Sequence, residues 1–436
     1  MPLPPSTSRR LGSFERAEAL TGRHFAYNLV VALRLARAPA DGDLRRALDA
    51  VRERHALLRS RIVGRGRRAR FEGGSVPAIP VRPMAADEDG WRAVVESELA
   101  SPFDVARGPL ARCVTAPAPD GARRDLVLTL HHAVVDAEGC LELVRRIVAS
   151  LAGEEGPAAA PAGLPPSPDA GFPAAYRAPR CWPASARFLL RELGGELAYR
   201  RRTRGFAAAP ASGPFRCRTL SVTLPEDETE ALVRASRRER VGLTAALDAA
   251  MLLAVARRRY GGRELPYRYF AFPLLRPYLR PPVPPEVFAS YTGIIRLTLG
   301  LSGATDPWTL AARIHRQIDA AVKRGDRFLA ARWSAFSMRT LFAQRARRMS
   351  TVALNYAGAV PGDLEPAIEE LHAFVTNFPL GPEYTAQTRI FRRRLCWDVV
   401  YLDVDMDRDE ALAIVEDARE TLARAAERPG REAGRE

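Results

Sequence analysis

The spacing of apolar residues along the chain alternates between the period of a strand and the period of a helix. An apolar run from Leu126 to Leu130 predicts a buried strand, and apolar residues from Leu141 to Leu151 recur at helical spacing. The same two patterns return later in the chain. They predict strands over 217–224, 294–300 and 352–358, and helices over 184–204, 225–240, 244–259 and 308–324. Strands and helices repeated in both halves predict an α/β (α+β) fold of two sandwich domains.

Residues 153–173 are rich in proline, alanine and glycine, which is typical of a segment without regular structure. We therefore predict a linker at 153–178, between an N-terminal half at 1–152 and a C-terminal half at 179–424. The end of the chain is charged, so 425–436 is predicted to be a disordered tail. Asp306 and Pro307 predict the start of the helix over 308–324, and Thr244 is a natural N-cap for the helix over 244–259.

Two neighbouring histidines and a carboxylate follow the first apolar run, in the segment HHAVVDAEG. Side chains alternate across a strand, so His131 and His132 should face opposite sides and only one of them can enter a given cavity. Two structural explanations stay open, because a strand-end histidine can be a packed core residue and Asp136 can be the N-cap of the following helix. A histidine with a pKa near neutrality can also take a proton from an attacking hydroxyl or amine.

Composition narrows the class of protein. The 436 residues are 47% hydrophobic, which is ample for sizeable buried cores. No apolar run reaches about 18 residues and no signal sequence stands at the start, so we expect no membrane span and a cytoplasmic protein. The five cysteines form no CxxC pair, which predicts neither a disulfide framework nor a zinc site. Cys140, beside the histidines, is either a nucleophile or, as we favour, a small buried residue at a helix start.

The formal net charge is +15, and of the 66 basic residues only Lys323 is a lysine. So lopsided a ratio is typical of a GC-rich genome, and no DNA- or RNA-binding signature accompanies it, so we expect no nucleic-acid partner. The densest arginine runs lie at 65–70 and 200–204. They are either solvated loop tips and helix ends, or a surface that attracts an anionic partner such as coenzyme A phosphates or an acidic acyl carrier protein.

HHAVVDAEG resembles the HHxxxDG motif of the chloramphenicol-acetyltransferase-like superfamily. That group includes peptide condensation domains, polyketide-associated acyltransferases, wax ester synthases and alcohol acetyltransferases. Four further segments follow in the family's order and are similar to its RHxxLR, FDxxxGPLxR, NLRxxL and FNYxG motifs. They are LRRALDAVRERHALLRSRI (44–62), SPFDVARGPLARCVTA (101–116), FPLLRPYL (272–279) and ALNYAGAV (353–360). The resemblance extends from Arg9 to Leu422.

Three departures from the family pattern are visible. Ala137 replaces the glycine after the aspartate, and Leu274 replaces the asparagine of the NLR triplet. The DFGWG motif of the plant branch is absent from the sequence. These departures argue against a close plant-type relationship but leave the central histidine intact.

The resemblance implies a fold of two chloramphenicol-acetyltransferase-like sandwich domains, related by pseudo-duplication, with an active-site tunnel between them. It also implies that His132 is the general base and that His131 points into the core in a supporting role. Asp136 would be structural and would pair with an arginine of the other half, which we place at Arg276. The alternative for Arg276 is a surface arginine in a proline-flanked loop.

Four more residues are candidates for the substrate site. Asn355 can donate to the developing oxyanion from its side-chain amide, or it can be a turn residue at a strand end. Tyr356 and Gly358, in the same segment, are expected at the substrate. Gly139 is expected to leave room for the acyl-pantetheine arm.

The predicted function is that of an acyltransferase in bacterial natural-product or lipid biosynthesis. It would move an acyl group from a thioester, of coenzyme A or a phosphopantetheinyl carrier protein, to a small-molecule alcohol or amine, with an ester slightly favoured over an amide. No bound cofactor or metal is expected, and we expect a monomer. Two alternatives are a free-standing nonribosomal peptide condensation domain and a catalytically silent relative that recruits a carrier protein or oxygenase. Silent relatives usually lose the second histidine, whereas His132 and Asp136 are both present here.

Overall fold

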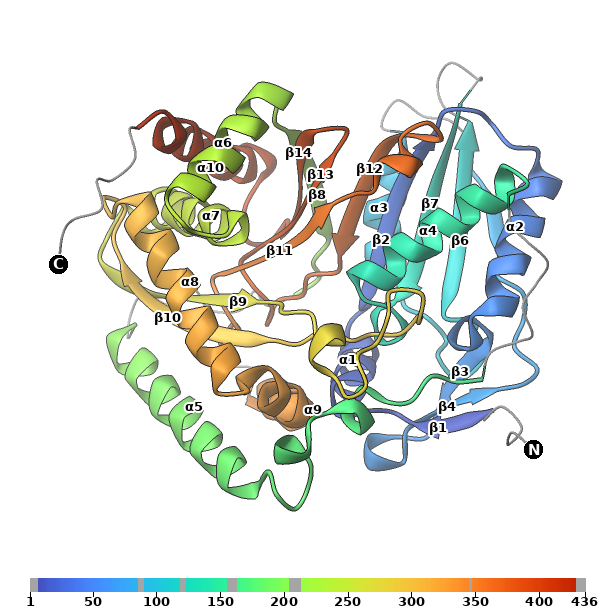
Figure 1. The fold of residues 1–436 in the computed structure, drawn as a ribbon, viewed down its shortest axis with the longest axis horizontal. Helices are drawn as coiled ribbons and strands as arrows, with labels where there is room; N and C mark the ends of the chain where they lie inside the picture. The colour runs from blue at the N-terminus through green and yellow to red at the C-terminus, as the bar shows by residue number, and fades with distance from the viewer. Residues whose placement is uncertain are drawn as a thin grey trace.

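The computed structural model describes residues 7–84, 90–117, 123–154, 163–203, 213–344 and 347–428 of the chain. Figure 1 shows them as two lobes that lie side by side, each built from a sheet with helices packed on it. One lobe is mainly blue and cyan and the other runs from green to red, so each lobe corresponds largely to one half of the sequence. No helix of these described residues is long and apolar enough to cross a membrane.

The N-terminal lobe is built on a five-stranded sheet with the order β12-β2-β7-β6-β5. The strands that the first half supplies to it are β2 (Asn28–Leu35), β5 (Val81–Pro83), β6 (Ala111–Pro117) and β7 (Arg124–His131). A small sheet lies beside it, made of β1 (Ser8–Arg10), β4 (Arg70–Gly73) and β3 (Ser60–Val63). The helices of this lobe are α1 (Ser13–His24), α2 (Asp41–Arg54), α3 (Trp91–Ala100) and α4 (Ala137–Leu151).

Strand β7 is buried along nearly its whole length because helices cover both of its faces. Leu126 and Leu128 pack with residues of α2 and α4, whereas Val127, between them, packs with residues of α3. This alternation is the ordinary consequence of strand geometry. It explains why the sequence of β7 is continuously apolar.

The C-terminal lobe is built on a six-stranded sheet with the order β10-β9-β11-β13-β14-β8. Its strands are β8 (Cys217–Thr223), β9 (Leu265–Ala271), β10 (Ile295–Leu301), β11 (Val352–Ala359), β13 (Tyr384–Phe391) and β14 (Arg394–Leu402). The helices are α5 (Trp182–Arg202), α6 (Glu226–Arg238), α7 (Leu243–Tyr260), α8 (Pro307–Lys323), α9 (Asp326–Gln344) and α10 (Arg408–Glu427). Strand β11 is parallel to both of its neighbours, and the other pairs are antiparallel.

Strand β12 (Ile368–Val375) crosses from the second half of the chain into the sheet of the first. It pairs antiparallel with the edge of β2, so that Leu371 lies opposite Leu33. The Asp398 carboxylate of β14 accepts from the Ala373 amide at 2.9 Å and lies 2.8 Å from Nδ1 of His372. The predicted division at 153–178 therefore does not separate two self-contained domains, because the second half completes the first half's sheet.

Most of the predicted elements are confirmed within two or three residues at their ends, among them the helix over 308–324, whose N-cap is Asp306. Thr244 is wrong as an N-cap, because the helix starts one residue earlier and Gly242 caps it. The predicted linker is not free where it is described: Phe172 is fully buried, and the Asp169 carboxylate accepts from the amide of Ser13 at the start of α1. The predicted tail starts too early, because α10 continues to Glu427; residues 429–436 lie outside the described residues.

The two arginine runs lie at exposed positions. Residues 66–68 form a short turn of 3-10 helix between β3 and β4, with exposed arginine side chains. Arg200, Arg201 and Arg202 form the exposed C-terminal turn of α5, where cations complement the helix dipole. Arg204 lies outside the described residues. These positions agree with solvated turn and helix ends.

Candidate active site

The two histidines of the motif separate at the end of β7. His131 is the last residue of the strand and is buried, and its Nδ1 accepts a hydrogen bond from the Ala133 amide at 3.1 Å. Its ring packs edge-on against Phe103. Burial lowers the pKa of His131 to about 3, so the ring stays neutral at physiological pH. His132 begins the short 3-10 helix His132–Val134 and turns the other way.

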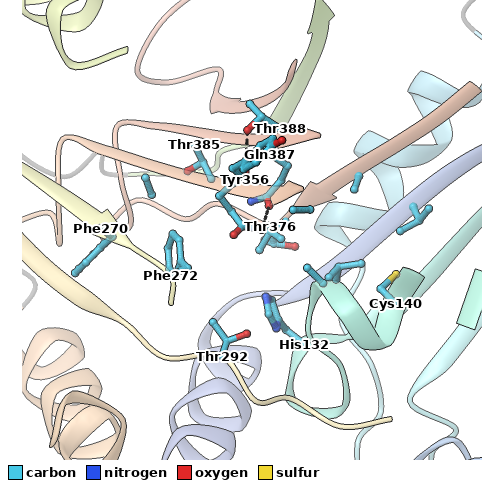
Figure 2. Close-up of a pocket in the computed structure, with 18 of the residues that line it drawn as sticks. His132, Cys140, Phe270, Phe272, Thr292, Tyr356, Thr376, Thr385, Gln387 and Thr388 are labelled. Carbon is cyan, nitrogen blue, oxygen red and sulfur yellow. Dashed lines mark hydrogen bonds between the residues drawn. The ribbon is translucent and has the colours of Figure 1, made fainter. Parts of the chain in front are cut away.

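His132 lines a cavity of about 350 Å³ between the lobes. Figure 2 shows its ring pointing into this space opposite Thr292. Both halves of the chain contribute to the walls, which include residues of α1, β2 and α4 from the first half and of β9, β11, β12 and β13 from the second. A cavity at the interface of two lobes is a common place for a ligand site.

The walls of the cavity differ in polarity. The part between β2, α4 and β12 is apolar and is formed by Leu29, Val31, Leu141, Val144, Ala373 and Val375. Thr376, Gln387 and Thr388 present polar groups near the centre of the close-up (Figure 2), and Asn355 of β11 also lines the cavity. The cavity that His132 lines therefore has both an aliphatic part and a set of polar side chains.

A buried carboxylate that the sequence motifs do not mark lies behind His132. Glu18, on α1, is 2% exposed, and its Oε1 lies 3.2 Å from Nδ1 of His132. Tyr27 stacks on a face of the imidazole, with ring centroids 5.1 Å apart. Burial lowers the pKa of His132, but the neighbouring Glu18, a backbone hydrogen bond and Asp136 together raise it, so that the net shift is upward. No element was predicted over 13–24, so no sequence signal pointed to this residue.

Asp136 has two roles at once. It is the N-cap of α4, where its Oδ1 accepts from the Gly139 amide at 2.8 Å. Its carboxylate also forms a bidentate ion pair with Arg276, at 2.7 and 2.9 Å, and accepts from the Tyr291 amide at 3.0 Å. Asp136 is therefore both the N-cap of α4 and the buried partner of Arg276, so the two explanations that the sequence left open are both correct.

Arg276 lies fully buried at the start of the 3-10 helix Arg276–Tyr278, so the surface-loop alternative is wrong. The donors that Asp136 does not use are bonded to backbone carbonyls of the proline-rich loop, residues 280–288, and of the segment after it. Nη1 donates to Pro284 and Val287 at 2.9 and 2.8 Å, and Nη2 to Ala289 at 3.2 Å. The guanidinium thereby connects the histidine loop, residues 132–136 of the first half, to the proline-rich loop of the second half.

Gly139 lies at a different place from the one expected. A Cβ there would stand 3.1 Å from Oδ1 of Asp136 and 3.3 Å from Nη2 of Arg276. The residue is not among the described residues that line the cavity. The expected passage of a pantetheine arm past Gly139 is therefore corrected: the lack of a side chain makes room for the buried ion pair.

The NYAG segment divides in the same way. Asn355 and Tyr356 line the cavity, and the Asn355 amide donates to Gln387 at 3.0 Å, which fixes its orientation. Gly358 is not among the described lining residues and has a φ of +87° at a break in the register between β11 and β13. Gly358 thus allows the backbone to adopt a positive φ, which few other residues adopt readily.

Cys140 also lines the cavity, but its thiol is buried and burial raises its pKa to about 12. A thiol with so high a pKa is not a nucleophile near neutral pH, so the packing role is the better interpretation. Within the described part of the chain, no cluster of three or more histidine, cysteine, aspartate or glutamate side chains is suited to a metal ion.

Comparisons with known proteins agree with this architecture. Residues 213–382 match the family model described as the phthiocerol/phthiodiolone dimycocerosyl transferase C-terminus. The solved structure of TRI3 trichothecene 15-O-acetyltransferase from Fusarium sporotrichioides superposes with a TM-score of 0.74 at 12% identity, covering 96% of this chain and 95% of that one. The first condensation domain of the calcium-dependent antibiotic synthetase gives a TM-score of 0.71 at 17% identity, covering 98% of both chains.

Sequence similarity extends to a peptide synthetase. The chain is 33% identical over 151 residues to phosphinothricin tripeptide synthetase PhsC of Streptomyces viridochromogenes, which is 33% of this chain and 13% of that protein. The chain therefore spans only a small part of this relative. Together these findings confirm the predicted fold class: the chain has the two-lobed fold of condensation domains and related acyltransferases.

Proposed function

We propose that this protein is an acyltransferase that moves an acyl group from a thioester to a hydroxyl or amine in natural-product biosynthesis. The observation that carries the proposal is His132, which lies in the cavity between the lobes with Nδ1 facing the Glu18 carboxylate. Nε2 is then the ring nitrogen left to face a substrate. A histidine held in this way is suited to general-base catalysis.

The reaction needs no nucleophile from the protein, because a thioester carbon is already activated. His132 accepts the proton of the acceptor hydroxyl or amine as that oxygen or nitrogen attacks the acyl carbon. The carbon–sulfur bond then breaks, and His132 donates the proton that it accepted to the departing thiolate. Asn355, on the cavity wall, is a candidate donor to the oxyanion, since Gln387 occupies only one of its two amide protons.

The apolar compartment between β2, α4 and β12 supports a chain of aliphatic character as the acyl group. Its walls are aliphatic side chains, and burying such a chain is favourable by about 25 cal/mol per Å² of apolar surface. Coenzyme A and carrier-protein thioesters both satisfy this chemistry. The condensation-domain fold favours a carrier-bound donor. The name of TRI3, a 15-O-acetyltransferase, denotes transfer to an oxygen and so favours formation of an ester.

The test is a panel of acyl-coenzyme A donors and acyl-loaded carrier proteins, each incubated with alcohol and amine acceptors and analysed by mass spectrometry. We expect an acylated acceptor and free thiol from the wild type. A second panel uses Val144→Phe, which narrows the apolar compartment and should shift donor preference toward shorter chains without abolishing turnover. Absence of product from every donor and acceptor would contradict the proposal.

A second candidate is a free-standing peptide condensation domain, which would join two carrier-bound substrates. The similarity to phosphinothricin tripeptide synthetase PhsC and to a condensation domain supports it. The same panel separates the two candidates when an aminoacyl carrier protein is included as acceptor. Amide formation only with that acceptor would favour the condensation activity.

A further inference from the structure

Glu18 belongs to none of the sequence motifs, yet it is the closest acidic group to the proposed base. It lies on α1, and its Oε1 is 3.2 Å from Nδ1 of His132. The hydroxyl of Ser290, from the other half of the chain, donates to the same oxygen at 3.1 Å. Oε2 is buried and has no hydrogen-bond partner within the described residues. The carboxylate thus lies at ion-pair distance from the imidazole, and Ser290 is the other partner that compensates for its burial among the described residues.

We infer that Glu18 is a positioning residue: its carboxylate holds His132 in the tautomer that leaves Nε2 free and stabilises the imidazolium formed during transfer. This inference rests on the proposed function. Because Nδ1 faces a carboxylate, the neutral ring carries its proton on Nδ1 and Nε2 is the basic nitrogen. When Nε2 accepts the acceptor's proton, the positive charge forms beside Glu18 and offsets a buried negative charge.

The other ionisable groups around the pair do not supply this function. Glu15, on the same helix, is bound to Arg9 at 2.7 Å and to the Gly12 amide. Tyr27 stacks on the ring, and its pKa is raised by burial, so it stays neutral. Asp136 is engaged by Arg276. Among the described residues, Glu18 is the carboxylate that contacts the imidazole of His132.

The shifts of the two groups agree with this geometry. Burial raises the pKa of Glu18 to about 7, and the neighbouring His132 opposes that rise. Burial lowers the pKa of His132, but Glu18, with smaller contributions from a backbone hydrogen bond and Asp136, raises it, and the net shift is upward. A general base works only when neutral, so turnover should rise as pH increases through the raised pKa of His132.

The test is Glu18→Gln, which keeps the size of the side chain and removes its charge. Without the carboxylate, the main influence that opposes burial is lost, so the pKa of His132 should fall and the acid limb of the kcat/KM profile should move to lower pH. The plateau of kcat should drop by about 10-fold or more, because the imidazolium loses its partner. NMR titration of labelled histidines, of which the chain has six, measures the pKa of His132 without any substrate.

Glu142→Gln is the matched control, because Glu142 is a partly buried carboxylate on α4 that pairs with Arg146 and is not among the described cavity residues. It should leave both the pKa of His132 and the acid limb unchanged. Glu18→Asp keeps the charge but withdraws it by one methylene, so it should give a pKa between those of the wild type and Glu18→Gln. If Glu18→Gln does not fold, Glu18→Asp carries the test.

The possible results separate the positioning role from the proposed function. A pKa of His132 that is the same in the wild type, Glu18→Gln and Glu18→Asp overturns the positioning role, whatever the activity. Full turnover of His132→Ala overturns His132 as the base and therefore the proposed function, even if the NMR titration shows that Glu18 and His132 are coupled. A lower plateau in Glu18→Gln with an unmoved acid limb and unchanged pKa indicates a purely structural role and also overturns the inference.

Discussion

The neighbouring histidines 131 and 132 differ in what their ring nitrogens contact. Nδ1 of His131 is used by a backbone amide and the ring is enclosed in the core, so its chemistry is confined to packing. His132 has Glu18 on one side and the cavity on the other. One residue of displacement along the chain is enough for this division, because the strand ends between them.

This contrast yields a paired prediction. His132→Ala should reduce turnover by roughly 10²-fold or more while leaving the fold intact. His131→Ala should act through stability, with a loss of roughly 1–3 kcal/mol in the free energy of unfolding, because it leaves the Ala133 amide without its acceptor. Chemical denaturation and steady-state kinetics on both variants check it. Equal loss of activity in two equally stable variants would contradict the assignment.

At the scale of the elements, the position of the histidine loop depends on contacts that reach across the two halves. Asp136 caps α4 and at the same time receives the guanidinium of Arg276 and the amide of Tyr291. Backbone carbonyls of the proline-rich loop accept further hydrogen bonds from Arg276. The loop is thereby fixed next to the cavity without any of these groups having to touch a substrate.

A double-mutant cycle tests this buried pair. Asp136→Ala and Arg276→Ala should each destabilise the protein by about 3–5 kcal/mol, because each leaves an uncompensated buried charge. The double variant should lose less than the sum of the two, since neither charge is then left without its partner. Urea denaturation of the four proteins gives the coupling energy. Strict additivity would show that the two side chains do not interact.

The sequence predicts some residues of the site and some elements correctly and misses others, for physical reasons. Asp136 and Arg276 were identified through motifs at fixed positions, and α8 through a clear capping pattern. Glu18 was missed because its partners are distant in sequence and α1 carries no such motif. Gly139 and Gly358 are predicted at the substrate but serve the ion pair and the backbone instead, because sequence alone does not show whether a glycine makes room for a ligand, for an ion pair or for a positive φ.

On the scale of the whole molecule, each lobe corresponds largely to one half of the sequence, but some elements cross between the lobes. Strand β12 completes the N-terminal sheet, while α3 packs against residues of β8 and β14 in one shared cluster. Helix α1, which carries Glu18, packs on α9 of the second half. Periodicity could not predict this exchange, because an apolar strand does not specify which sheet it joins.

The exchange predicts that residues 1–152 do not fold alone. Without β12, the backbone edge of β2 is unpaired and the apolar residues that pack on it, Ile368 and Phe374 among them, are missing. An open apolar edge of this kind favours aggregation. The isolated fragment should therefore bind a hydrophobic dye and show no cooperative thermal transition, whereas co-expression with residues 163–436 should yield a soluble complex. Circular dichroism melting and size-exclusion chromatography provide the measurement. A cooperative transition in fragment 1–152 alone would show that the first half is a self-sufficient domain and that β12 only adds to a sheet that is already stable.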